Sequence, residues 1–267
     1  MPGNEIAAGP RAHRGERPAA LWEVRVNSEY FEISDRFCGP PSSGNGGYVC
    51  GRIAKDLAGT VSVRLKAPPP LNTPLRREWT SDGARLLQGT TLIGEAKLSE
   101  LALEAPNPPS VGEATQAARS YPGFTNHVFP RCFVCGPARS AGDGLRIFPG
   151  LLENRTVHAA PWVPAPSLGD EAGKVAPEFI WSALDCPSGF AVLPAPDGMA
   201  VVLGELCATL LGDLHVGQPA IVSAWPIARE GRRRTAGSAI HNAAGELVAI
   251  ARAVWIEVPA SQWSPGA

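Results

Sequence analysis

The chain repeats one order of predicted elements, and this repeat constrains its fold more than any other feature. In the first segment a strand-like stretch, residues 22–33, precedes a turn rich in Gly, Pro and Ser. An apolar stretch with helix-like spacing, residues 48–57, comes next. Strand candidates then follow at 59–67, at 75–82 and at 84–103, the last of them broken near Gly94.

The second segment, residues 132–258, has the same order of elements. Strand-like residues 145–152 and 155–160 precede an apolar stretch of helix length, residues 177–192. Four strand candidates follow, at 201–211, 218–230, 232–242 and 246–258. Turn chemistry also matches, because in both segments an apolar strand ends in Trp and leads into a hairpin turn with Gly.

This repeat predicts an α+β chain in which an antiparallel sheet wraps around a central helix, twice. Two such sheets joined edge to edge would cover exposed strand edges and form an intrachain pseudo-dimer. The expected divisions are a disordered tail at 1–21, an N-terminal domain at 22–104, a linker at 105–130, a C-terminal domain at 131–258 and a tail at 259–267.

Composition excludes several classes of function. Lys and Arg number 24 against 25 Asp and Glu, so the net charge of -1 gives no bulk attraction to nucleic acid or to an anionic membrane. We expect neither partner. The sequence has no apolar run of membrane-spanning length and no apolar stretch of a signal peptide near its start, which predicts a cytoplasmic protein with six reduced cysteines.

Two short motifs ahead of and within the predicted helices resemble the double hotdog acyl-CoA thioesterases. In related single-hotdog enzymes a His-Gly-Gly turn opens the central helix, and an acidic residue follows seven positions after the second Gly. Here the first half has Gly44-Asn45-Gly46-Gly47 but carries Ala54 at the acidic position, whereas the second half lacks the glycine pair but carries Asp185. The resemblance implies two tandem hotdog domains, with one complete site shared between the halves and a second, inactive one.

The chemistry of these residues is consistent with that resemblance. Backbone N–H groups at Gly46 and Gly47, at the start of a helix, are expected to stabilise the oxyanion of an attacked thioester. Asp185, in a mostly apolar helix, is expected to act as a general base or as a nucleophile. Asn45 and Ser188 are candidates to orient water or the carboxylate. His241, in a predicted hairpin strand, is an outside candidate.

Substrate contacts are expected from one basic run and several aromatic residues. Arg232, Arg233 and Arg234 at a hairpin turn match phosphate groups such as those of coenzyme A, although such a run is more often a solvated surface. Arg76 and Arg77 are weaker candidates. The aromatic candidates for the acyl site, which core packing explains equally well, are Tyr48, Phe179, Trp181, Phe190 and Trp225.

Cys132 and Cys135 form the other visible motif, a C-x-x-C pair. Two cysteines at this spacing supply half of a tetrahedral zinc site, but the sequence has no second such pair, and only the fold could recruit His127 or Cys186. We therefore interpret the pair as structural, with metal and redox roles as alternatives, and assign no metal ligand.

Taken together, the sequence predicts hydrolysis of an acyl-CoA thioester, with coenzyme A as part of the substrate, no other cofactor, and a possible homodimer. Two alternatives remain within the fold: a non-catalytic acyl-CoA or lipid-binding protein and an enoyl-CoA hydratase. The hydratase normally needs a His close to the Asp, and the sequence shows none near Asp185. A zinc-dependent protein is a third alternative.

Overall fold

The computed structural model describes residues 28–263, so the predicted tail at 1–21 and the last residues of the chain lie outside it. Its helices and strands, in chain order, are β1 Ser28–Phe31, η1 Asp35–Phe37, α1 Gly46–Ala54, β2 Thr60–Leu65, β3 Leu75–Thr80, β4 Gly83–Gln88, β5 Thr91–Leu98, α2 Val111–Ala118, η2 Pro122–Phe124, β6 Gly150–Leu151, β7 His158–Trp162, η3 Pro166–Leu168, α3 Pro177–Phe190, β8 Met199–Leu210, β9 Ala220–Glu230, β10 Arg233–Asn242, β11 Leu247–Pro259 and η4 Ala260–Trp263.

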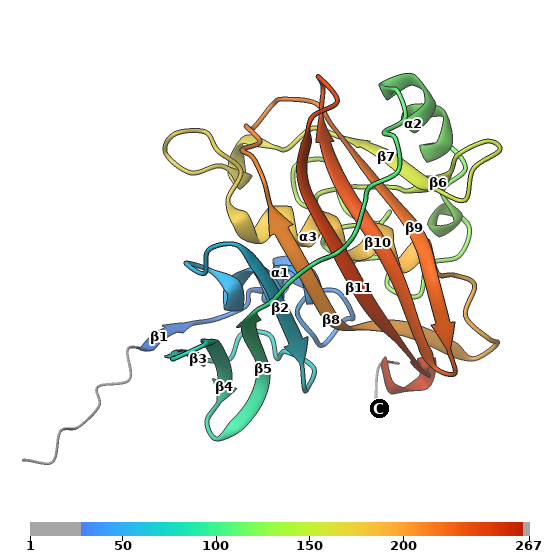
Figure 1. Cartoon of the computed structure of the whole chain (residues 1–267). Helices are drawn as coiled ribbons and strands as arrows, with labels where there is room; N and C mark the ends of the chain where they lie inside the picture. The colour runs from blue at the N-terminus through green and yellow to red at the C-terminus, as the bar shows by residue number, and fades with distance from the viewer. Residues whose placement is uncertain (1–27, 264–267) are drawn as a thin grey trace, which may run out of the picture.

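The strands form one antiparallel sheet whose order reads almost the same from either end. The 11-stranded order is β1-β3-β4-β5-β2-β8-β11-β10-β9-β7-β6. The first-half strands β1, β3, β4, β5 and β2 therefore correspond to β7, β9, β10, β11 and β8 of the second half. This arrangement confirms the predicted pseudo-dimer of two sheets joined edge to edge, and Figure 1 shows α1 against the first-half strands and α3 against the second-half strands.

Strands β2 and β8 make the joint between the halves. Thr60 pairs with Thr209 and Arg64 with Glu205 in an antiparallel register. The Arg64 Nε lies 2.6 Å from the Glu205 carboxylate, and Ser62 Oγ donates to the same side chain at 3.2 Å. The joint is thus held by backbone pairing and by side chains that bridge the halves.

Two glycines one turn apart let the helices α1 and α3 approach each other closely. A Cβ atom added at Gly47 would lie 2.5 Å from the Asp185 Cβ, and one added at Gly51 would lie 2.5 Å from the Glu178 Cα. Real side chains do not approach so closely, so only glycine permits this contact at either position. The close packing brings the first turn of α1 against the middle of α3.

The predicted helices and long strands are present, and four details differ from the expectations. The first-half strand expected to break near Gly94 breaks instead at a hairpin containing Gly89, whose φ is +57°. The strand expected at 145–152 is reduced to β6, of only 2 residues. The expected linker at 105–130 contains α2 and η2, and the expected C-terminal tail begins with η4.

The segment between β5 and α2 packs on the face of the second-half sheet opposite α3. Leu103 and Ala105 pack against a cluster of buried residues that includes Ile221, Trp225 and Ala239. In Figure 1 this segment, drawn in green, runs across the strands of the second half to reach α2. A Ser110–Glu113 capping box begins α2. Because the helix is short and lies between prolines, its sequence shows little apolar periodicity from which it could be predicted.

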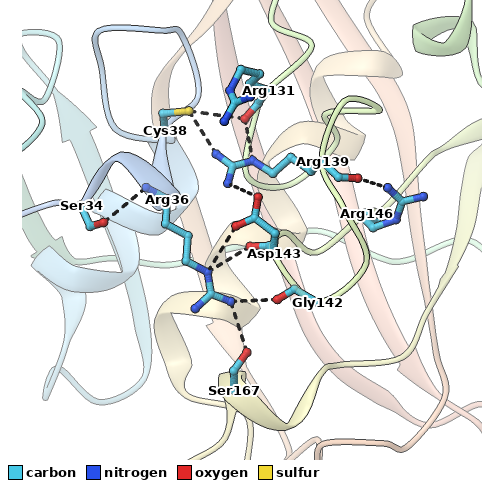
Figure 2. A network of polar contacts seen from close by, with 9 residues as sticks. All are labelled: Ser34, Arg36, Cys38, Arg131, Arg139, Gly142, Asp143, Arg146 and Ser167. Atoms are coloured by element: carbon cyan, nitrogen blue, oxygen red, sulfur yellow. Dashed lines mark hydrogen bonds and ion pairs between the residues drawn. The ribbon is translucent and has the colours of Figure 1, made fainter.

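A polar network fixes the loop between η2 and β6 against the first half of the chain (Figure 2). Arg139 donates to the Arg131 carbonyl at 2.7 Å, to the Asp143 carboxylate at 3.0 Å and to the Cys38 sulfur at 3.2 Å. Arg36, from η1, donates to the Asp143 carbonyl at 3.0 Å. The loop that carries Cys132 and Cys135 is therefore held in place from both of its sides.

No helix within residues 28–263 is long and apolar enough to cross a membrane.

Candidate active site

Asp185 is buried at the contact between α3 and the first turn of α1, with only 2 % of its surface exposed. Its Oδ2 accepts a hydrogen bond from the Gly47 backbone N–H at 2.9 Å and another from Asn45 Nδ2 at 2.9 Å. Asn45 is also the N-cap of α1, since its Oδ1 accepts from the Tyr48 N–H at 2.9 Å. The structure thus brings the acidic residue of one half to the glycine turn of the other.

The two oxygens of Asp185 differ in their surroundings. Among residues 28–263, no group donates a hydrogen bond to the buried Oδ1. Burial raises the pKa of the Asp185 carboxyl to about 7, while the Gly47 and Asn45 hydrogen bonds act in the opposite direction. A carboxylate with one anchored oxygen and one free oxygen, with a pKa near neutrality, is suited to exchange a proton with a bound molecule.

A cavity of about 790 Å³ opens beside this carboxylate. Its walls come from both halves: the first turn of α1, the end of α3, the start of β8, the end of β11 and residues 122–135. Asn45, Gly46 and Asp185 lie among the lining residues, and apolar side chains such as Leu203 and Trp255 supply much of the rest. The cavity has the size and apolar walls of a small-molecule site.

The two glycines of the α1 turn have different positions. Gly46 lines the cavity and is partly exposed, and its amide is one of the first-turn N–H groups that an α-helix leaves without an internal partner. The Gly47 N–H donates to Asp185 instead, which differs from the expected role as a second oxyanion donor. Gly47 therefore positions the carboxylate, and Gly46 is the glycine of this pair that lines the cavity.

Ser188 and His241 lie away from this arrangement. Ser188 Oγ donates to the Asp185 backbone carbonyl at 2.6 Å and accepts from Trp255 Nε1 at 2.9 Å, so it ties α3 to β11 rather than orienting water or the carboxylate. His241 is 4 % exposed on β10 and is not among the residues, within 28–263, that line the cavity.

The arginine run does not act as one group. Arg234 is buried, where it pairs with Glu257 and donates to the carbonyls of Val192 and Pro194, so it supports the cavity wall that follows α3. That is a structural role, which corrects its assignment to phosphate. Arg232 and Arg233 are exposed at the β9–β10 hairpin. The weaker candidate Arg77 is also buried, with its Nε donating to the Ile53 carbonyl at 3.0 Å.

Most of the aromatic candidates belong to the core. Tyr48 stacks on Phe37 with ring centroids 4.2 Å apart, and Phe179 packs against both rings. Trp181 is buried beside Gly51, and Trp225 lies in the cluster on the opposite face of the sheet. In the part of the chain that the structure describes, Phe190 is the one candidate of this group that lines the cavity. The sequence pattern alone did not distinguish aromatic residues of the core from those at the cavity wall.

Three buried thiols meet at the cavity wall, an arrangement that the sequence does not reveal. The sulfurs of Cys132, Cys135 and Cys186 all lie within 4.8 Å of one another, and Cys132 Sγ is 3.5 Å from Cys186 Sγ. Hydrogen bonds from the other two thiols hold the pKa of Cys132 well below its ordinary value, and burial raises the pKa of Cys135. His127 also lines the cavity, with its Nε2 3.3 Å from Cys135 Sγ.

Solved structures of other proteins support the fold, whereas the sequence comparisons find no match. No family model matches the chain, and no curated protein matches it. The tesB protein of Mycobacterium avium subsp. paratuberculosis superposes with a TM-score of 0.56 at 13% identity, covering 87% of this chain and 93% of that protein.

Two further solved structures agree. A protein of Thermobifida fusca, named as a candidate thioesterase II, superposes with a TM-score of 0.57 at 15% identity, covering 88% of this chain and 94% of the other. A conserved hot dog fold protein of unknown function from Alicyclobacillus acidocaldarius gives 0.54 at 11% identity, covering 86% and 93%. With the palindromic sheet and its two central helices, these likenesses identify the chain as a double hotdog protein of the thioesterase-like fold.

Proposed function

We propose that the protein hydrolyses an acyl-CoA thioester at the cavity beside Asp185. The observation that carries the proposal is a buried carboxylate with one oxygen anchored by Gly47 and Asn45 and the other free, next to the open first turn of α1. The fold shared with proteins named as thioesterases supports this choice of reaction.

The acyl carbonyl binds with its oxygen at the first turn of α1. There the Gly46 amide and the helix dipole stabilise negative charge on that oxygen as the carbon becomes tetrahedral. The acyl chain occupies the apolar part of the cavity, against side chains such as Phe190, Leu203 and Trp255. The site takes groups from both halves of the chain, so one half alone does not form it.

Asp185 acts as the general base. Its free Oδ1 accepts a proton from a water molecule as the water oxygen attacks the thioester carbon. When the tetrahedral intermediate collapses, the carbon–sulfur bond breaks, and the leaving thiolate takes the proton that Asp185 accepted, which gives free coenzyme A and the carboxylic acid and restores the base. Gly47 and Asn45 hold the other oxygen throughout, so the orientation of the base is set before the substrate binds.

The test is release of free thiol from a panel of acyl-CoAs, from acetyl to palmitoyl with benzoyl and phenylacetyl, by wild type and Asp185→Asn. Asparagine keeps the size of the side chain but has no basic oxygen, so turnover should fall at least ~100-fold with little change in KM. Binding of acyl-CoA without thiol release by wild type would instead support a non-catalytic binding protein. Water addition to an enoyl-CoA would support the hydratase alternative.

A single turnover in ¹⁸O-labelled water distinguishes the two roles of Asp185. A general base leaves the label only in the released acid, whereas a nucleophilic carboxylate forms an anhydride with the acyl group, and attack of labelled water at the Asp185 carbon of that anhydride puts the label in the peptide that contains Asp185. We expect an unlabelled peptide.

A further inference from the structure

The three thiols at the cavity wall come from two elements that are 51 or more positions apart in sequence. Cys132 and Cys135 lie on the loop after η2, and Cys186 lies on α3 directly after Asp185. All three are buried, and all three line the cavity. Convergence of three thiols at one point is therefore a product of the tertiary fold.

The spacing of the sulfurs matches that of three ligands on one metal ion. Zinc–sulfur bonds of about 2.3 Å in a tetrahedron place two sulfurs about 3.8 Å apart. The separation of Cys132 and Cys186 is 3.5 Å, and each of the three pairs lies within 4.8 Å. Small shifts of the side chains would bring all three sulfurs onto one ion.

The loop is built to hold this geometry. Gly136 follows Cys135, and its N–H donates to the Cys132 carbonyl at 2.9 Å, so the backbone folds tightly around the pair. A Cβ atom at Gly136 would lie 2.5 Å from the same carbonyl oxygen. Together with the Arg139 network of Figure 2, this turn fixes Cys132 and Cys135 without the help of a ligand.

Nitrogen groups surround the sulfurs as they surround bound thiolates. Asn45 Nδ2 lies 3.6 Å from Cys186 Sγ and 3.9 Å from Cys132 Sγ. His127 Nε2 lies 3.3 Å from Cys135 Sγ, and its Nδ1 accepts from the Phe129 N–H at 2.9 Å. That second bond places the ring proton on Nε2, so His127 donates to the Cys135 sulfur and is not itself a ligand.

We propose that Cys132, Cys135 and Cys186 bind one Zn²⁺ ion through their three sulfurs, with the fourth position filled by water from the cavity. Soft thiolates in a tetrahedral arrangement favour zinc over the hard cations, and on binding the thiols release their protons to solvent. Three protein ligands and one exchangeable position distinguish this site from a closed structural site. The ion lies on the same cavity wall as Asp185.

The first measurement is the metal content of the full-length protein, purified without chelator and then reconstituted anaerobically with one equivalent of Zn²⁺ or Co²⁺. We expect one tightly held ion per chain. X-ray absorption should show three sulfur neighbours and one nitrogen or oxygen around zinc, and Co²⁺ should give thiolate charge-transfer absorption. Failure of wild type to retain either ion after reconstitution would overturn the proposal, as would a shell with two or four sulfurs.

Variants assign the ligands. We expect zinc binding to weaken by more than ~100-fold in each of Cys132→Ser, Cys135→Ser and Cys186→Ser. That exceeds the loss expected on removal of a residue that only hydrogen-bonds to a metal ligand. The matched control is Cys207→Ser, because Cys207 is equally buried but lies on β8, with its Sγ 4.0 Å from the Glu100 carbonyl. Equal loss of zinc in the control would contradict the assignment.

The same cluster has a redox alternative that the test separates. Titration of the unfolded, metal-free protein should find all six cysteines as free thiols. Two fewer thiols, with a mass lower by two hydrogens, would show one disulfide, and peptide mapping that places it among Cys132, Cys135 and Cys186 would overturn the zinc proposal. Neither measurement depends on thioester hydrolysis. A failure of the zinc proposal can therefore be distinguished from a failure of the proposed function.

Discussion

At the scale of single residues, Asn45 connects the stability of α1 to the orientation of Asp185. Its Oδ1 caps the helix, while its Nδ2 donates to the carboxylate. Asn45→Ser keeps a side-chain oxygen suited to the cap and loses the donor to Asp185. We expect kcat to fall about 10- to 100-fold, the effect of one hydrogen bond to a charged group, with stability within ~1 kcal/mol of wild type.

The comparison for that variant is Asn45→Ala, which loses both contacts. It should show the same loss of kcat and a further loss of about 1 kcal/mol in the free energy of unfolding, measured with urea. Full activity in Asn45→Ser would mean that Asp185 does not need this hydrogen bond.

Gly47 is the residue at which the helices and the site depend on each other most directly. In Gly47→Ala the new Cβ would lie 2.5 Å from the Asp185 Cβ, so α1 and α3 must separate. We expect a loss of about 1–3 kcal/mol in stability, as for other overpacked core positions, together with loss of thiol release.

Gly112 provides the matched control for that substitution. It lies in the first turn of α2, where the nearest atom to an added Cβ is 3.8 Å away. Gly112→Ala should stabilise the protein by about 0.5–1 kcal/mol, because alanine has the better helix propensity. Differential scanning calorimetry of both variants measures the contrast, and equal effects would show that helix spacing is not the cause.

At the scale of elements, the loop that carries Cys132 and Cys135 depends on Arg139 (Figure 2). This guanidinium is 5 % exposed and bonds to a carbonyl, a carboxylate and a sulfur. Arg139→Ala removes all three of these hydrogen bonds, so the free energy of unfolding should fall by about 2 kcal/mol or more. Arg119→Ala, at the exposed end of α2, should change it by less than ~0.5 kcal/mol, and hydrogen exchange should locate the loosening in residues 131–146.

Elements with a strong local pattern were predictable from the sequence. The apolar spacing at residues 48–57 and 177–192 gave α1 and α3, and a Gly turn between two strand-like runs gave the β10–β11 hairpin. The helix α2 was missed because its stability comes from a capping box and from packing on β7, not from a long apolar face. Residues 122–129, expected as linker, also lack a local apolar pattern, so they were not recognised as part of the cavity wall.

The candidate site was less accessible than the fold because its members meet only through tertiary contacts. Motif spacing pointed to Asn45, Gly46 and Asp185, which the fold brings together. It did not show that the Gly47 amide is used by Asp185, or that Arg234 is buried against Glu257. Those outcomes depend on which residues pack against Gly47 and Arg234 in the folded chain. The sequence around each position does not determine that.

At the scale of the whole molecule, the two halves share an architecture but have divided their chemistry. The sheet order is nearly symmetric about the β2–β8 joint, yet the glycine turn lies on one helix and the acidic residue on the other. The candidate site therefore needs α1 and α3 in contact. The symmetric position in the first half is Ala54, which has no ionisable group.

On mild acidification two buried histidines should lower the stability of the molecule, because they must become charged, whereas the raised pKa of Asp185 acts in the opposite direction. Burial lowers the pKa of His158 and of His241, and the Nδ1 of each lacks a hydrogen-bond partner among residues 28–263. Protons therefore bind the unfolded chain more readily than the folded one. The stability is fully present above the unfolded pKa of about 6.5 and is lost as the pH falls below it toward the folded values.

The variant His241→Gln isolates one of these contributions, because glutamine has a similar size and no titration in this range. Urea unfolding at pH 7.5 and at pH 5.5 should show that acidification lowers the stability of wild type relative to that of the variant. The difference arises because only the wild-type unfolded chain gains a proton at position 241. An equal change in both proteins would assign the acid sensitivity to other groups, with His158→Gln as the next variant to compare.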